Sequence, residues 1–234
     1  MFFSFLLFSF TFMYLSPYLA VMGTLKGVVA SGLAFWGLFL LTAPVLGRAA
    51  GGYICPLGGL QDSLHTGMEK PIARVRYLKV VKWAIWALWM LAIILAARAS
   101  GGWRRFDLLF GNETGLPPYH AQAYVIMFGF MLATALPAMF LGQRGFCHYF
   151  CFFAPLNILG AKVGRALRLP MLPVAATGRE DCKSCHLCDR GCPMSLPVQD
   201  MVRSGTLRHD ECIACGACST VCRPGATSYG FTRG

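Results

Sequence analysis

Charged side chains are scarce in this sequence, and acidic ones are the scarcest. The 234 residues include 10 Asp and Glu against 21 Lys and Arg, and charged residues make up 13% of the chain, whereas roughly 25% is typical of soluble domains. Hydrophobic residues make up 56%. The composition excludes an ordinary soluble domain and indicates an integral membrane protein. The sequence also lacks a Rossmann fingerprint, a P-loop and a hydrolytic constellation, so a nicotinamide or nucleotide site would belong to another subunit.

Charge is absent from two long stretches, Phe2–Met22 and Gly27–Gly47. Each has 21 residues, which matches the roughly 20 residues that a transmembrane helix needs. The first is interpreted as a span and not as a cleaved signal peptide, because it lacks a basic segment and its apolar run is too long. Two further predicted spans are Val80–Ala99 and Ala121–Gly142.

Histidine is absent from all four predicted spans, since the five histidines are His65, His120, His148, His186 and His209. Histidine pairs that hold a b-type haem inside the membrane are therefore excluded. Three tryptophans recur along the third span, namely Trp83, Trp86 and Trp89. Interface anchoring with helix packing is the preferred interpretation of this set, and cofactor stacking is the alternative.

The distribution of basic residues predicts the orientation. The connection between spans two and three contains Arg48, Lys70, Arg74, Arg76, Lys79 and Lys82, whereas the next connection contains Arg98, Arg104 and Arg105. By the positive-inside rule, both termini and everything after Gly142 lie on the cytoplasmic side of a prokaryotic inner membrane. Residues 1–179 carry 15 basic and 4 acidic side chains and residues 180–234 carry 6 of each, so the net charge of +11 reflects membrane topology and not a nucleic-acid partner.

Basic residues also mark the segment after the fourth span. Lys162, Arg165 and Arg168 lie at steps of three among apolar residues within 155–169. This spacing favours an interfacial helix on anionic lipid headgroups, and a short packing helix is the alternative. Residues 170–179 contain two prolines and several small residues, which predicts a linker.

The cysteines near the C-terminus carry the most specific signal. Cys182, Cys185, Cys188 and Cys192 follow the pattern CxxCxxCxxxCP, and Cys212, Cys215, Cys218 and Cys222 repeat CxxCxxCxxxC. Three cysteines at intervals of three let one tight loop wrap a four-iron cluster, and in duplicated domains the fourth thiolate comes from the other motif. One [4Fe-4S] cluster is therefore predicted at Cys182, Cys185, Cys188 and Cys222, and a second at Cys212, Cys215, Cys218 and Cys192.

Other uses of these cysteines fit the spacing less well. Zinc favours two separated CxxC pairs, and disulfides are disfavoured in a reducing compartment. The segment CKSCH (182–186) also matches the attachment motif of c-type haem, but Cys188 and Cys192 complete a cluster motif and the segment is predicted to be cytoplasmic.

The predicted fold is accordingly an α-helical integral membrane protein with a soluble cluster domain. Four transmembrane helices in two duplicated pairs occupy residues 1–169, and a linker follows at 170–179. Residues 180–234 are predicted to form an α+β bacterial-type 2[4Fe-4S] ferredoxin domain.

The membrane part contains its own repeat. The segments RAAGGYIC (48–55) and RGFCHYFC (144–151) align at an offset of 96 residues. The matched pairs are Arg48 with Arg144, Tyr53 with Tyr149, and Cys55 with Cys151, while Cys147 matches Gly51. Each helix pair therefore ends in a turn that carries cysteine, at 48–56 and at 144–155.

This arrangement resembles the NapH-type membrane ferredoxins, with similarity to the membrane part of NosR regulators and to CcoG-like proteins. Their signature is a CxxxCP element after each helix pair. The first copy here reads GGYICP and lacks the leading cysteine, and the second reads CHYFCFFAP, where Pro155 comes late. The resemblance implies an electron-transfer subunit of an oxidoreductase complex that relays electrons between the quinone pool and a redox partner. It also implies two [4Fe-4S] clusters as cofactors, with membrane lipid, quinone and other redox subunits as partners.

The remaining cysteines allow a second hypothesis. If the two turns converge, Cys55, Cys147, Cys151 and His148 are candidates for a membrane-face thiol or metal site, because soft ligands suit copper(I), zinc or a thiol redox step. In that case the protein is a metal-handling factor that reduces copper, and the alternative is that these cysteines pack as small hydrophobes. A third interpretation is a structural anchor for the cluster domain. The sequence assigns no residue to quinone binding. The polar groups near this face are Tyr53, Tyr149, His65 and His148. His65 and His120 are single residues in loops, which is typical of solvated positions.

Overall fold

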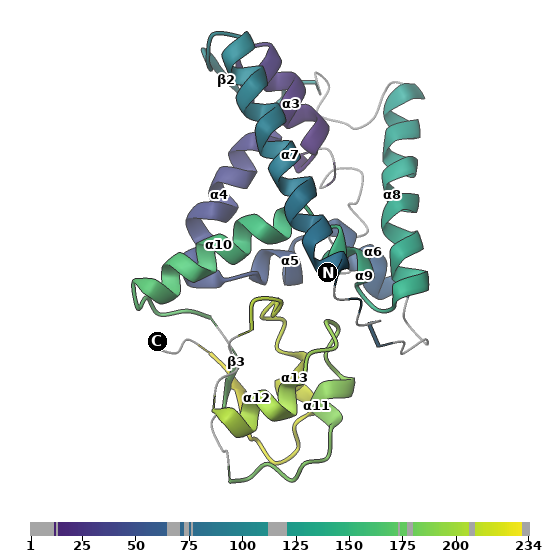
Figure 1. The fold of residues 1–234 in the computed structure, drawn as a ribbon, viewed down its shortest axis with the longest axis vertical. Coiled ribbons are helices and arrows are strands. Elements are labelled where there is room, and N and C mark those ends of the chain that lie inside the picture. The colour runs from purple at the N-terminus through teal and green to yellow at the C-terminus, as the bar shows by residue number, and fades with distance from the viewer. Residues whose placement is uncertain are drawn as a thin grey trace.

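The computed structural model describes residues 12, 14–64, 71–72, 75, 77–111, 121–172, 174–176, 180–205 and 209–230. These residues are mostly helical. In the view of Figure 1, long apolar helices form the upper part and a small cysteine-rich part lies below them.

Two helices are long and apolar enough to cross a membrane among the residues described, α7 (Leu78–Ala99) and α8 (Ala121–Leu141). They have 22 and 21 residues, so each is about 30 Å long, the thickness of the hydrocarbon core. Large apolar side chains on both helices are exposed, with Leu88 at 67% and Phe140 at 77%. A core helix of a soluble protein would bury such side chains, so their exposure favours contact with lipid. The third and fourth predicted spans thus coincide with membrane-length helices.

The first two predicted spans differ from the structure. Helix α4 (Ser31–Leu46) has 16 residues, because Val28–Ala30 form strand β1 and pair in parallel with β2 (Arg105–Asp107). At about 24 Å, α4 is shorter than the hydrocarbon core.

Most of the first predicted span, Phe2–Met22, lies outside the described residues, and within the rest the chain turns at Leu15 and Ser16 before α3 (Pro17–Leu25) begins. Pro17 stands at the first position of this helix, where its missing N–H costs nothing. A complete set of four spans stays a prediction.

The two cysteine turns have the same backbone conformation. Helix α5 (Ala49–Tyr53) precedes Cys55 and α9 (Gly145–Tyr149) precedes Cys151, each with five residues. In both turns the cysteine N–H donates to a carbonyl five residues earlier, at 3.0 Å. Each turn is followed by a further helix, α6 (Pro56–Leu64) and α10 (Phe153–Ala166). The sequence repeat at an offset of 96 is therefore also a repeat of local structure.

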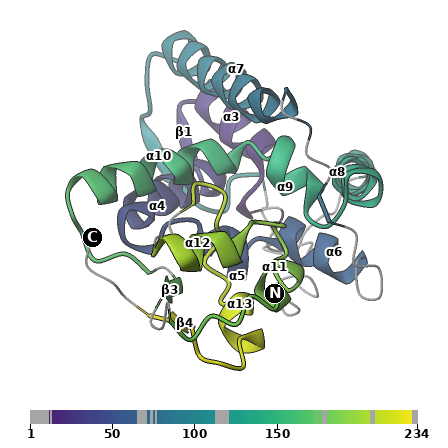
Figure 2. The same cartoon turned by 60° about the horizontal axis from the view of Figure 1, so that its bottom comes forward.

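Helix α10 lies between the apolar helices and the cysteine-rich part (Figures 1 and 2). It crosses α4 at very short range through two glycines: a Cβ on Gly160 would lie 2.5 Å from Cβ of Ala43, and one on Gly164 would lie 2.0 Å from the carbonyl oxygen of Pro44. Two of the basic residues expected to meet lipid headgroups pair with Asp210, Arg165 at 2.6 Å and Lys162 at 3.6 Å. Helix α10 therefore packs on α4 and contacts the cysteine-rich part, and its place at the lipid interface stays a prediction.

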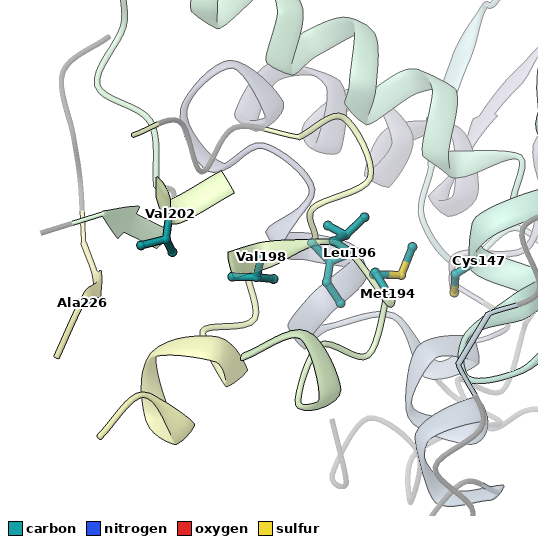
Figure 3. Packing of buried hydrophobic residues seen from close by; sticks show 7 residues of the cluster. Cys147, Met194, Leu196, Val198, Val202 and Ala226 are labelled. Carbon is teal, nitrogen blue, oxygen red and sulfur yellow. The ribbon is translucent and has the colours of Figure 1, made fainter. Parts of the chain in front are cut away.

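The cysteine-rich part contains three short helices and a strand pair. The helices are α11 (Leu187–Arg190), α12 (Val198–Ser204) and α13 (Ala217–Val221), and strand β3 (Val174–Ala176) pairs antiparallel with β4 (Thr227–Tyr229). Strand β3 falls inside the predicted linker, residues 170–179, because β4 supplies hydrogen-bonding partners for its backbone. The apolar core of this part contains Met194, Leu196, Val198 and Val202, and Cys147 of α9 packs against it (Figure 3).

We expect Gly164→Ala to destabilise the fold, because the new methyl group would overlap the backbone of Pro44 and overpacking costs about 1 to 3 kcal/mol. The measurement is the thermal midpoint of the full chain in detergent. Gly37→Ala is the matched control, since a Cβ at Gly37 in α4 meets nothing within 4 Å. Equal midpoints for the two variants would contradict the close packing of α10 on α4.

Candidate functional site

The two cysteine motifs fold into matching loops. Ser184 and His186 in the first loop and Ala214 and Gly216 in the second have φ angles of 56°, 56°, 50° and 74°. These left-handed residues lie at the same positions, 30 residues apart, and each loop then enters a short helix, α11 or α13. Alternating backbone conformations of this kind curl a chain and turn its N–H groups to one side, which suits an anionic group. The local fold therefore follows from the repeated motif.

Each loop lines a small cavity together with one cysteine of the other motif. Cys182, Cys185, Cys188 and Cys222 line the first cavity, and Cys212, Cys215, Cys218 and Cys192 line the second. Each cavity thus brings together the four cysteines that the spacing predicts for one cluster, and their role as cluster ligands stays a prediction. Four thiols around one cavity are the donor set that a [4Fe-4S] cluster requires, so the residues present fit this cofactor.

A four-iron cluster and a single zinc ion require different spacings of their thiols. Among the described residues, no three Cys, His, Asp or Glu side chains are close enough to hold one metal ion. A four-iron cluster binds each thiolate to a different iron, so its thiols lie farther apart than those around one zinc ion. Burial raises the pKa of Cys192 to about 11 and that of Cys218 to about 12, so these thiols release protons only when a metal binds them.

A buried carboxylate joins the second cysteine loop to the apolar helices. Glu211, directly before Cys212, pairs with Arg48 at 2.6 Å and also with Lys82 of α7. All three side chains are at least nine-tenths buried. Burial alone would raise the pKa of Glu211, but Arg48 and Lys82 outweigh it and lower the pKa to about 2. The carboxylate is therefore ionised at neutral pH and holds two cations from different helical segments.

The first cysteine turn also touches the second cysteine loop directly. The hydroxyl of Tyr53 lies 3.1 Å from the carbonyl oxygen of Cys215 and 3.1 Å from the hydroxyl of Tyr229. A Cβ on Gly52 would lie 2.6 Å from the carbonyl oxygen of Ile213, so only glycine allows α5 to approach this closely. The cavity of the second motif is therefore the one next to the membrane part, whereas Cys185 of the first motif is exposed.

The three remaining cysteines line one cleft, which is the convergence that the hypothesis of a membrane-face thiol site assumed. Cys55, Cys147 and Cys151 line one cleft between the membrane part and the second cysteine loop, and Ile213 of that loop forms part of its wall. Burial raises the pKa of Cys55 to about 11 and that of Cys151 to about 12, so both thiols are protonated at neutral pH. Gln61 donates a hydrogen bond to Sγ of Cys147 at 3.0 Å. The three thiols are not close enough to hold a single metal ion as they stand.

The predicted polar groups separate into different environments. His148 does not line the thiol cleft; its ring packs edge-on against Tyr149, and burial lowers its pKa to about 4, so it is neutral. Tyr149 accepts a hydrogen bond from the N–H of Val75 at 3.1 Å. His65 and His120 lie outside the described residues.

Sequence reasoning missed two residues at these sites. Glu211 stands beside Cys212 in the segment DECIAC, and an acidic residue next to a predicted ligand is a signal that could have been noted. Asn157 lines the thiol cleft from α10, but a lone asparagine in an apolar helix gives no pattern from which its place could be inferred.

Comparison with known proteins gives relatives over most of the chain. MauN of Methylorubrum extorquens, a methylamine utilization ferredoxin-type protein, is 28% identical over 75% of this chain and 59% of its own length. The ferredoxin-type protein NapH of Escherichia coli is 25% identical over 88% of this chain and 71% of its own length. The putative electron transport protein YccM of the same organism is 24% identical over 92% of this chain and 59% of its own length. No protein-family model and no solved structure matches the chain. These relatives confirm the resemblance to NapH-type ferredoxin proteins.

We expect Glu211→Gln to weaken attachment of the cysteine-rich part, because it leaves Arg48 and Lys82 buried without a counter-charge, at a cost of about 3 to 5 kcal/mol. The measurement is the free energy of unfolding in denaturant, at several pH values. Asp210→Asn is the control, since this neighbouring carboxylate is 41% exposed and its loss should cost about 0 to 1 kcal/mol.

The difference in free energy of unfolding between wild type and Glu211→Gln is expected to depend on pH, because the pKa of Glu211 is lowered in the folded protein. The contribution of Glu211 is complete above its ordinary value of 4.5 and is lost as the pH falls toward about 2, where the carboxylate takes up a proton. A difference between wild type and Glu211→Gln that stays constant from pH 6 to pH 3 would contradict this role.

Proposed function

We propose that this protein is a membrane-anchored iron–sulfur electron-transfer protein that connects the quinone pool to a redox partner. The observation that carries the proposal is the pair of cavities, each lined by four thiols in the exchanged pattern. An electron-transfer role and redox partners in general are also supported by relatives named as ferredoxin-type and electron transport proteins. The quinone pool and a respiratory complex as the two ends of the path belong to the proposal.

The residues that would hold the two [4Fe-4S] clusters are the two sets of four cysteines. Clusters bound there would supply one-electron redox chemistry. The chain's own residues fix where this chemistry takes place. Tyr53, Gly52 and Arg48 hold the loop of the second set against the membrane part, and the apolar core around Met194 and Val202 keeps the two loops together.

The two cysteine sets differ in their surroundings, which gives the proposed path a direction in space. The second set adjoins α5 and the thiol cleft, whereas the first includes the exposed Cys185. The membrane carrier is therefore expected to exchange electrons at the second set, and the partner at the first.

The proposed location is the cytoplasmic membrane of a prokaryote, with the cysteine-rich part on the cytoplasmic side. Support comes from α7 and α8, which have membrane length, and from the basic residues at the end of the helices where the cysteine-rich part lies, Arg48, Lys82 and Arg144.

The exchanged ligand sets are tested by single substitutions. We expect Cys182→Ser and Cys222→Ser to abolish the same cluster signal in electron paramagnetic resonance, and Cys192→Ser and Cys212→Ser to abolish the other. Bound iron should fall from roughly eight to roughly four atoms per chain in each variant, because one cluster loses a ligand. If Cys182→Ser and Cys192→Ser instead abolished the same signal, the exchange would be wrong.

The relay itself is tested by anaerobic titration of the purified full chain in detergent. We expect a quinol analogue to reduce at least one cluster signal, because the second cysteine set adjoins the membrane part. Dithionite serves as the control that reports all clusters present. Clusters that dithionite reduces but that neither give electrons to a quinone nor take them from a quinol would contradict the quinone relay.

A further inference from the structure

The thiol cleft has a composition suited to an uncharged organic ligand. Its lining is largely apolar and includes Leu15, Phe39 and Phe153 beside the three thiols. The cleft is partly open to its surroundings, and its free volume is about 30 Å³, enough for about two water molecules. A ring is larger than this volume, so its entry requires lining side chains such as Phe39 or Phe153 to move. The cleft lies at the apolar helices, because Phe39 belongs to α4 and Phe153 to α10.

One polar atom in the wall of the cleft lacks a partner. Asn157 is 5% exposed, and its side-chain oxygen Oδ1 has no hydrogen-bond partner among the described residues. Buried polar atoms are paired in more than about nine cases in ten, so an orphan acceptor in a cleft indicates a donor that binds there. A hydroxyl group is such a donor.

The cleft also has open space beside the Cα atom of one of its lining residues, Gly51. Gly51 lines it, and a Cβ built on this residue meets nothing within 4 Å. In the second turn the matched position is occupied by Cys147. The first turn therefore leaves open the space that a side chain would fill.

The cleft also adjoins the second cysteine loop. Ile213, which forms part of its wall, lies directly after Cys212, and Arg48 lines the cleft while it pairs with Glu211 on the other side of Cys212. A ligand in the cleft is therefore within one residue of a predicted cluster ligand. Short separation is what electron exchange between a carrier and a cluster requires.

We propose that the thiol cleft binds the headgroup of a membrane quinol, with Oδ1 of Asn157 accepting a hydrogen bond from a quinol hydroxyl. The required ligand is lipid-soluble, uncharged, able to donate a hydrogen bond and able to exchange electrons, and quinols combine these properties. The inference rests on the proposed function and names its substrate site. Asn157 and Gly51 were absent from the polar groups that the sequence suggested for a quinone.

Two substitutions test the site by different means. Asn157→Leu removes the acceptor and keeps the number and branching of the side-chain heavy atoms, and Gly51→Leu fills the open space. Gly37→Leu is the matched control, because a Cβ at Gly37 also meets nothing within 4 Å but Gly37 does not line the cleft. We expect both cleft variants to raise the half-saturating concentration of a short-chain naphthoquinol at least tenfold in anaerobic reduction of the clusters. The control should match wild type, and reduction by dithionite should be the same in all four proteins.

Binding is measured separately by tryptophan fluorescence with the oxidised naphthoquinone as quencher. The Trp36 ring centroid lies 4.7 Å from that of Phe153, whose side chain lines the cleft, so a quinone there should quench Trp36. We expect saturable quenching in wild type and in Gly37→Leu, and its loss in Gly51→Leu and Trp36→Phe. Asn157→Leu should still show quenching, because the oxidised quinone has no hydroxyl to donate to Oδ1 of Asn157.

The two measurements separate the site from the relay. Quenching and quinol reduction that remain at wild-type levels in both cleft variants would overturn the site and leave the relay standing. Quenching that depends on Gly51, without reduction of any cluster by quinol, would support the site and overturn the relay. Neither quenching nor reduction in wild type would overturn both.

Discussion

The buried carboxylate of Glu211 is the interaction on which the arrangement of the two parts depends. It neutralises Arg48, at the start of the first cysteine turn, and Lys82, near the start of α7, and it directly precedes Cys212. Burying two cations costs several kcal/mol unless a counter-charge is supplied. Each part is therefore destabilised when the other is absent, because a buried charge is left without its partner. Because the carboxylate belongs to the second cysteine loop, the charge that attaches this loop also fixes its cavity beside the thiol cleft.

The two matched cysteine turns, 48–56 and 144–155, use their arginines for contacts with different parts of the protein. Arg48 and Arg144 match in sequence and are both buried, but Arg48 reaches across to Glu211, whereas Arg144 binds Asp62 within the membrane part through two contacts of 2.6 and 2.8 Å. The first turn is thereby directed toward the cysteine-rich part, and the second is held to α6. The two turns also differ at one matched position of the cleft. Gly51 in the first turn leaves an open space beside its Cα, whereas Cys147 in the second turn places a side chain there.

The sequence was most informative where a residue type has one dominant use at a given spacing. The eight cysteines at an offset of 30 indicated the two sets that line the two cavities, and the repeat at an offset of 96 raised the hypothesis that Cys55, Cys147 and Cys151 meet. The sequence was not informative where a strand forms only because a segment distant along the chain pairs with it. Strand β3 forms in the predicted linker because β4 pairs with it, and Val28–Ala30 leave the second span because β2 pairs with them. Asn157 has no spacing that could reveal it.

Several of the basic residues that predict the orientation pair with acidic residues in the folded protein, and this bears on how that prediction works. Of the cations counted after spans two and four, Arg48, Lys82, Lys162 and Arg165 pair with Asp210 or Glu211. Both acids lie far along the chain, and domains generally form in order from the N-terminus during synthesis. In the predicted orientation, these cations would still be unpaired while the helices insert and would be available to the positive-inside rule. In the folded protein the same cations bind Asp210 and Glu211 and thereby attach the cysteine-rich part. One set of basic residues would therefore act on the predicted topology first and on the folded structure afterwards.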